Sequence, residues 1–106
     1  MRLVTTDFID ETEVVTGEIV YAVAVSGANI VRDMREAIIN TIGGRMTKYE
    51  QLVDMTIARA LDMLKARAAE QGYDGVLAVR LSHPVITNGA VEVVATGTGF
   101  KYAAKP

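Results

Sequence analysis

The sequence predicts an α+β fold: a two-layer sandwich in the order strand, strand, helix, helix, strand, strand, with helices on one face of an antiparallel sheet. Three observations carry this prediction. A long stretch in the middle of the chain has apolar residues at helical spacing, and apolar runs of strand length stand before and after it. The last two of these runs are separated by Asn88-Gly89, a pattern typical of a tight β-hairpin turn.

The middle of the chain predicts one long helix from Lys48 to Gln71. Thr47 and Glu50 have the spacing of a capping box, in which the two side chains satisfy N–H groups at the start of a helix. Gly72 follows as a C-terminal stop, because glycine adopts a left-handed backbone without steric cost. The predicted packing face of this helix consists of Leu52, Val53, Ile57, Ala60, Leu61, Leu64 and Ala68.

A second flank of the same helix carries Met55, Arg59, Met63 and Ala66. Two partly apolar flanks on one helix indicate two packing partners, the sheet and a second surface. The alternative is that the methionines only widen a single core face, since methionine fills irregular gaps readily.

The N-terminal part of the chain predicts two strands, a short one from Leu3 to Thr6 and a long one from Thr12 to Val25. Gly17 lies inside the long strand and predicts a bulge or bend there. The run from Ile19 to Val25 is apolar on both of its faces rather than alternating. We therefore expect both faces to be covered, one by the helix and the other by a neighbouring subunit.

The remaining elements are a first helix and a C-terminal hairpin. Asn29 is the expected N-cap of the first helix, which ends at Gly43-Gly44. Strands are predicted over Gly75 to Val85 and over Ala90 to Tyr102. A two-residue turn between them would place one set of side chains on a shared face: Leu77, Val79, Leu81 and His83 with Val94, Thr96, Thr98 and Phe100. The other face would hold Gly97 and Gly99, where a helix or another chain could approach closely.

Composition narrows the class of protein. A chain of 106 residues fits one domain, 1–106, and its 50% apolar content with a mean hydropathy of +0.23 is high for so small a domain. Self-association is the simplest use for the surplus apolar surface, because no apolar run approaches the ~18–20 residues of a membrane-spanning helix. The net charge of −2 argues against a nucleic-acid partner. The chain has no cysteine, and its N-terminus lacks a signal-peptide pattern; we therefore expect a cytoplasmic protein.

The densest group of functional side chains forms a candidate ligand-binding site: Asn29, Arg32, Asp33, Arg45, Tyr49 and Glu50. A Gly-Gly-Arg turn that leads into a helix N-terminus can hold an anion. The alternative, which we favour, is that the charged members pair with one another and tie helices or subunits together. The glycines do not form a phosphate-binding loop, since no Gly-Lys-Ser/Thr follows them.

His83 is the only histidine, and Glu92 lies near it in the predicted hairpin. Together they are a candidate metal site, but metal centres need several ligands of matching type, and this chain has no cysteine to add. His83 would have to recruit carboxylates from several subunits. An ordinary histidine at the end of a strand is the simpler interpretation.

Several segments resemble the YbjQ-like family of small bacterial and archaeal proteins. These segments are Val15-Thr16-Gly17-Glu18, Gly27-Ala28-Asn29-Ile30-Val31-Arg32-Asp33, Gly43-Gly44-Arg45 with Tyr49-Glu50, and Gly97-Thr98. The resemblance implies a fold like the dodecin subunit and assembly as a ring, typically a pentamer. It implies no reaction, because the family has no established biochemical function. Members of this family are sometimes labelled as heavy-metal-binding proteins. That label is hard to reconcile with a chain that has no cysteine.

Taken together, these observations predict a cytoplasmic homo-oligomer, a pentameric ring, with a binding or scaffolding role and no evident catalytic site. The expected interface consists of the central strands, which are Ile19–Val25 and the final hairpin, together with the methionine flank of the long helix. Neither a nucleic acid nor a membrane is expected as a partner, and the sequence does not identify a cofactor or a small-molecule or metal ligand. Two alternatives stay open: metal binding through His83 and carboxylates at subunit interfaces, and an enzyme whose interface site surrounds Arg45 and Glu50.

Overall fold

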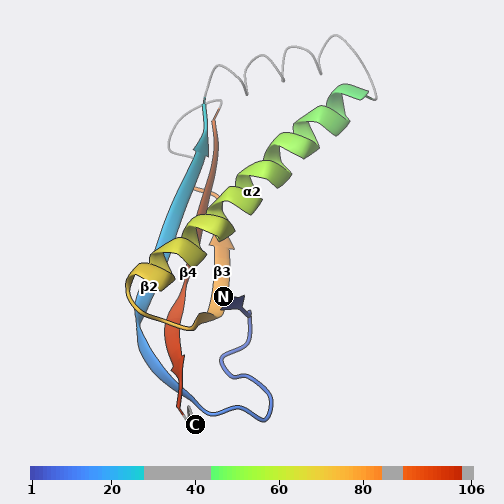
Figure 1. Cartoon of the computed structure of the whole chain (residues 1–106). Helices are drawn as coiled ribbons and strands as arrows, with labels where there is room; N and C mark the ends of the chain where they lie inside the picture. Colours follow the sequence, from blue (N-terminus) through green and yellow to red (C-terminus); the bar gives the residue numbers. More distant parts are fainter. Residues whose placement is uncertain (28–43, 85–89, 104–106) are drawn as a thin grey trace.

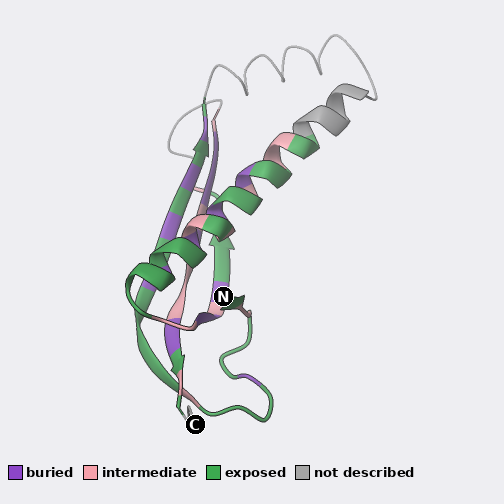
Figure 2. Ribbon diagram, in the orientation of Figure 1, coloured by how far each residue is buried: buried purple, intermediate pink, exposed green. Residues whose placement is uncertain are grey.

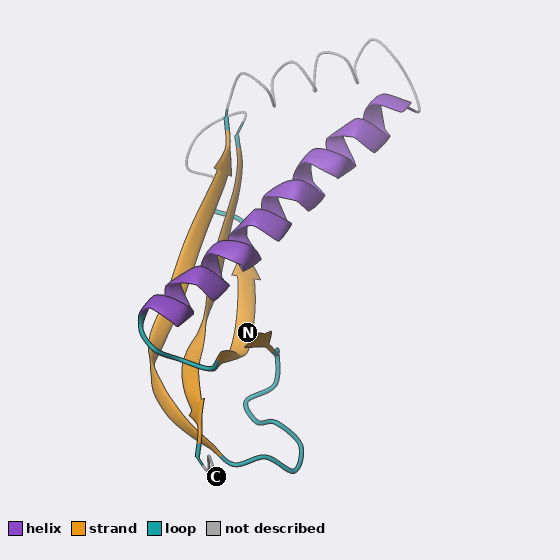
Figure 3. Ribbon diagram, in the orientation of Figure 1, coloured by secondary structure: helices purple, strands orange, loops and turns teal. Residues whose placement is uncertain are grey.

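The computed structural model describes residues 1–27, 44–84 and 90–103, with the backbone alone for 44–49. The elements in these residues are β1 (Arg2–Leu3), β2 (Val14–Ser26), α2 (Gly44–Glu70), β3 (Gly75–Ser82) and β4 (Val91–Tyr102). The strands form one sheet in the order β1-β3-β4-β2, and α2 crosses one face of it (Figures 1 and 3). The predicted α+β layering is confirmed for the described residues, whereas the predicted first helix lies outside them.

The sheet is mixed, so the prediction of a purely antiparallel sheet is wrong. β4 pairs antiparallel with both β2 and β3, but β1 pairs parallel with β3. The N-terminal segment continues beside β3 after β1 ends, with the N–H of Val4 donating to the carbonyl of Val76 at 3.0 Å. The chain then loops around the end of the sheet and enters β2 at the opposite edge (Figure 1). β1 and β2 therefore cannot form a hairpin.

The main core lies between α2 and the sheet. Val20, Ala22 and Ala24 of β2 point toward the helix and are fully buried. From α2, Ala60, Leu64 and Ala68 are fully buried against them, and the other apolar residues of the predicted packing face lie partly buried around this cluster. The predicted helix face is confirmed. The small side chains of β2 allow the helix to pack close to the sheet.

The ends of α2 differ from the prediction at one side only. The helix begins at Gly44, four residues before the expected start, so Thr47 and Glu50 lie inside it and the predicted capping box is wrong. The C-terminal end is as expected, since Gly72 has a left-handed φ of 84°. The N–H of Tyr73 donates to the carbonyl of Ala68, and that of Gly72 to Ala69, both at 3.0 Å. These are the two bonds of a Schellman motif.

Tyr73, which follows this helix end, packs on the sheet and contacts both β2 and β4. Its ring lies over Gly17 and Gly99, where a Cβ atom on either glycine would overlap it. Its hydroxyl accepts a hydrogen bond from the N–H of Glu18 at 2.7 Å. This contact sits at the irregularity in β2, where the register against β4 shifts between Thr16 and Ile19. The bulge predicted from Gly17 is confirmed, and the tyrosine explains it.

The β3–β4 register differs from the prediction. Leu77 pairs with Thr98 but Arg80 with Thr96, so two residues of β3 stand opposite Gly97. Ala78 absorbs the extra residue with a φ of 53°. The bulge turns Val79 toward the helix, away from the face of Leu77, and the predicted shared face of this strand is therefore wrong.

The glycines of β4 do not receive another chain. A Cβ atom on Gly97 would overlap Val76, and one on Gly99 would overlap Tyr73. Both recesses are filled by side chains of the same molecule.

A second, smaller core lies on the face of the sheet away from α2. Leu77 and Phe100 are buried there under Ile9, which the loop between β1 and β2 supplies. This loop covers only the lower end of that face (Figure 1). The molecule is elongated, with extents of 60 × 24 × 17 Å. Within the described residues, no helix has the length and apolar character that crossing a membrane requires.

Candidate functional site

The most distinctive surface is the face of β2 that points away from α2. We call it the uncovered face; it consists of Ile19, Tyr21, Val23 and Val25. These side chains alternate with the buried ones under the helix, and each is between 42% and 65% exposed. Figure 2 shows this alternation of buried and exposed residues along the strand. A contiguous exposed apolar patch is typical of a binding surface.

Neighbouring residues of β4 extend the uncovered face with uncharged side chains, apart from the almost buried Glu92 opposite Val25. Val94, Thr96 and Thr98 stand opposite Val23, Tyr21 and Ile19 respectively, and all three are half-buried. In the described sheet β2 is also an edge strand, with β4 as its single neighbour. From residue 19 to the end of β2 the strand has no charged residue and no proline, the usual means of blocking edge-to-edge contact.

One flank of α2 borders the uncovered face. We call Arg59 and Arg67 the arginine margin. The Arg67 guanidinium lies over the Tyr21 ring, with its carbon 5.2 Å from the ring centroid. Nη2 of Arg59 donates to the carbonyl of Val25 at 3.3 Å.

The methionines of this flank differ from each other. Met63, between the two arginines, packs partly into the core, whereas Met55 is 64% exposed. Met63 therefore widens the core face, as the alternative predicts, whereas the second packing surface predicted for this flank stays a prediction for Met55.

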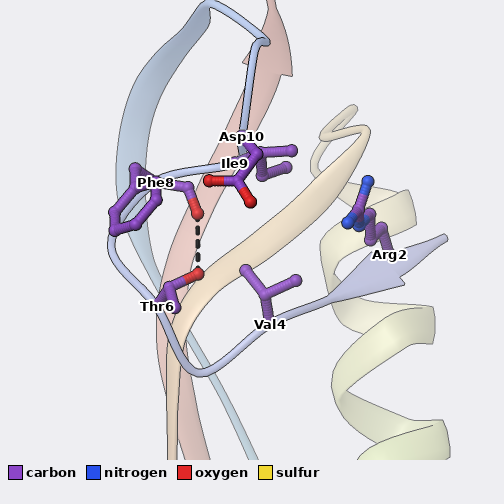
Figure 4. Close-up of a pocket in the computed structure, with 6 residues that line it drawn as sticks. All are labelled: Arg2, Val4, Thr6, Phe8, Ile9 and Asp10. Carbon is purple, nitrogen blue, oxygen red and sulfur yellow. Dashed lines mark hydrogen bonds between the residues drawn. The ribbon is translucent and has the colours of Figure 1, made fainter.

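A shallow pocket lies at the other end of the molecule, between β1 and the loop that follows it. Its residues are Arg2, Val4, Thr6, Phe8, Ile9 and Asp10 (Figure 4). The volume is about 130 Å³, well below the roughly 300–1,000 Å³ of small-molecule sites. The Thr6 hydroxyl is already engaged with the Phe8 carbonyl at 2.6 Å. We therefore do not regard this pocket as a ligand site.

The predicted polar site is only partly within the described residues. Asn29, Arg32 and Asp33 lie outside them, and for Arg45 and Tyr49 the structure describes the backbone of α2 but no side chain. Glu50 lies exposed in the second turn of α2. The candidate site therefore stays a prediction.

His83 and Glu92 occupy different environments. His83 is exposed and lies just beyond the end of β3, while Glu92 is almost buried on β4 opposite Val25. Because of the register shift in β3, the residues that stand opposite each other on β3 and β4 differ from those in the predicted hairpin. Across the described ranges, no three histidine, aspartate or glutamate side chains gather closely enough to hold a metal ion.

Two features of the surface were not predicted from the sequence. Arg67 continues the i, i+4 row of Met55, Arg59 and Met63, so its place beside β2 could have been inferred from that spacing. Phe8 is 56% exposed within an acidic loop. The sequence signal for this exposed residue is a single aromatic side chain in a segment that is polar apart from Phe8 and Ile9.

These features define a small α+β domain whose sheet is covered by a helix on one face and left partly bare on the other. A sequence model described as "Putative heavy-metal-binding" matches residues 1–103, and the chain belongs to the corresponding YbjQ_1 family.

Relatives of similar length support this membership. A UPF0145 protein of Synechococcus sp. (strain JA-3-3Ab) is 35% identical over 107 residues, which cover 95% of this chain and 98% of the relative. A UPF0145 protein of Halalkalibacterium halodurans is 37% identical over 92 residues, which cover 87% of this chain and 81% of the relative.

A solved structure shares the fold. It is a protein of unknown function from Pediococcus pentosaceus ATCC 25745, described as a member of the DUF74 family. The TM-score is 0.67 at 16% sequence identity, and the match covers 96% of this chain and 97% of the other. None of the three proteins is named for a reaction, so function has to be argued from the surface of the molecule.

Proposed function

We propose that the protein is a cytoplasmic homo-oligomer with a binding or scaffolding role, and that its subunits meet through the uncovered face. The observation that carries this proposal is the row of four apolar side chains on one face of β2. Burial of apolar surface contributes about 25 cal/mol per Å² removed from water, so a second copy that covers this row would stabilise the assembly. The family resemblance supports a closed ring, typically a pentamer.

The shape of the chain supports the same proposal. Its radius of gyration is 17.2 Å, whereas a compact domain of this length has about 13 Å. The helix α2 has 27 residues and is therefore about 40 Å long. Long elements around a thin core leave much surface per residue, which a ring of several copies would partly bury.

The interface in this proposal joins the uncovered face to the flank of α2. Arg59 and Arg67 already reach from the helix to β2, so the two surfaces are continuous. Exposed Met55 extends the flank along the helix. The candidate polar residues of the sequence are assigned in this proposal to a site near a subunit junction: Asn29, Arg32, Asp33, Arg45, Tyr49 and Glu50.

Heavy-metal binding, which the family description names, fits this chain poorly. Soft metals select thiolate and thioether ligands, and zinc, copper and nickel also accept imidazole. The chain has no cysteine and one histidine, and the thioethers of its five methionines are only weak electron-pair donors. Glu92 is almost buried on β4, whereas His83 is exposed beyond the end of β3. We therefore do not propose a metal site, and no described contact favours an enzyme at Arg45 and Glu50.

Native mass spectrometry of freshly purified protein tests the proposal. We expect a single closed oligomer rather than a ladder of masses, because a ring satisfies every copy of the interface. Extra mass per ring would reveal a retained ligand or metal, and the variant His83→Ala would show whether a metal depends on the histidine. A monomer at micromolar concentration would contradict the proposed function.

A further inference from the structure

We propose that the loop of residues 6–12 of one copy docks on the uncovered face of the next copy. In this contact Phe8 covers the apolar side chains of β2, and the acidic residues of the loop meet the arginine margin. The inference rests on the proposed self-association and names the two surfaces that meet.

The loop is built to present Phe8. Ile9 is buried beside Leu77 and Phe100 and anchors the loop to the sheet. The Thr6 hydroxyl donates to the carbonyl of Phe8 at 2.6 Å, so the backbone at the exposed phenylalanine is fixed (Figure 4). Exposed, rigid aromatic side chains often dominate the binding energy of an interface, because little conformational freedom is lost on binding.

The turn that follows is fixed as well. The N–H of Thr12 donates to the carbonyl of Ile9 at 3.2 Å, and its hydroxyl donates to the carbonyl of Asp10 at 3.0 Å. Between them, Glu11 has a left-handed φ of 54°, which costs energy for a residue other than glycine. These contacts fix the backbone from which the side chains of Asp10 and Glu11 project.

Charge complements the apolar match. The loop region carries Asp7, Asp10, Glu11 and Glu13, all exposed. Opposite charge stands beside the uncovered face, where the Arg67 guanidinium lies over the Tyr21 ring. A guanidinium has five N–H donors, so one that lies over an aromatic ring can still bind carboxylates. An apolar patch with an arginine margin therefore suits a partner that presents an aromatic side chain among carboxylates.

The occupant in this proposal is a second copy of the chain. Within one chain, buried Ile9 packs over Leu77 and Phe100 and holds the loop at the lower end of the same sheet face. The loop and the uncovered face are also two different surfaces of the chain. A contact between two different surfaces repeats from copy to copy and forms a ring where the rotation between copies closes, whereas a patch that pairs with itself stops at a dimer.

Charge reversal on each side, followed by recombination, tests this inference. We expect Asp7→Lys/Asp10→Lys and, separately, Arg59→Glu/Arg67→Glu to raise the concentration at which the oligomer dissociates about tenfold or more. The four changes in one chain should restore assembly, because opposite charges again face each other. Phe8→Ser should weaken assembly without unfolding the protein, since its side chain is largely exposed.

Lys65→Glu is the matched control, because Lys65 is an exposed cation on α2 outside the arginine margin. It should leave the dissociation concentration unchanged. Native mass spectra over a dilution series give the readout, and circular dichroism confirms the fold of each variant. A wild-type oligomer that is unaffected by Phe8→Ser and by both reversals would overturn the loop contact while leaving the proposed self-association intact. A monomeric wild type would instead contradict the self-association itself.

Discussion

Val23→Glu is expected to convert the oligomer into folded monomers. Val23 lies in the middle of the uncovered face and is 42% exposed in the single chain, so a glutamate there can remain in water when the chain is alone. In an interface the same carboxylate would lose its hydration next to apolar side chains. That penalty is roughly 3 kcal/mol or more per contact, a factor of about 10² in the dissociation constant.

Val15→Glu is the matched control for this prediction. Val15 belongs to the same strand and is 60% exposed, but it pairs with Lys101 on the opposite face of the sheet. The Val15→Glu variant should therefore form an assembly with the wild-type mass, measured by light scattering at equal protein concentration. If Val23→Glu also kept that mass, the uncovered face could not be the subunit contact.

Gly99→Ala is expected to destabilise the folded protein by about 1–3 kcal/mol, the usual cost of overpacking a well-packed site. The added methyl group would overlap the Tyr73 ring. The ring cannot move freely, because the Tyr73 hydroxyl is held by the N–H of Glu18 at 2.7 Å. The free energy of unfolding from urea titration, at fixed protein concentration, measures the loss.

A double-mutant cycle shows whether the tyrosine is the cause. In the background of Tyr73→Ala, the change Gly99→Ala should cost far less, with a coupling free energy of about 1 kcal/mol or more. Gly27→Ala is the control, since a Cβ atom there would meet nothing within 4 Å. Equal costs of Gly99→Ala in both backgrounds would show that Tyr73 does not fill the recess at this glycine.

The sequence predicts α2 and its packing against one face of β2 because periodic patterns report burial directly, whereas the expected cover of the other face by a neighbouring subunit stays a prediction. Leu64 and Ala68 follow helical spacing and are fully buried. Val20 and Val23 are both apolar although they point to opposite faces of β2, and the helix covers only the face of Val20. A strand that is apolar on both faces but covered on one is what a chain with an external partner requires.

The β1–β3 pairing and the β3–β4 register are not predictable in the same way. A strand as short as Arg2–Leu3 has no pattern that sets its direction, and its parallel partner is fixed by contacts far along the chain. The bulge in β3 falls on Ala78, which has a φ of 53° although alanine gives no sequence signal for that conformation. Tyr73, which holds the irregular part of β2 to the sheet, acts through two glycines distant in sequence.

For the candidate polar site, the sequence identifies the residues but not their role. Its residue types indicate an anion site or an ion-pair network, and the sequence cannot decide between them, because both use the same side chains. Arg67, by contrast, contacts Tyr21 across the edge of the sheet. That contact depends on the angle at which α2 crosses β2, and this angle is known only from the three-dimensional structure.

Thiol protection at Val23 shows directly whether subunits meet through the uncovered face, because the chain has no cysteine of its own. The measurement compares the rates at which Val23→Cys and Val15→Cys react with a bulky maleimide reagent in the native protein. We predict that the thiol at position 23 reacts many times more slowly where the oligomer forms, and that the two rates converge on dilution into monomers. Equal rates at every concentration would show that the uncovered face stays in water and would contradict the account.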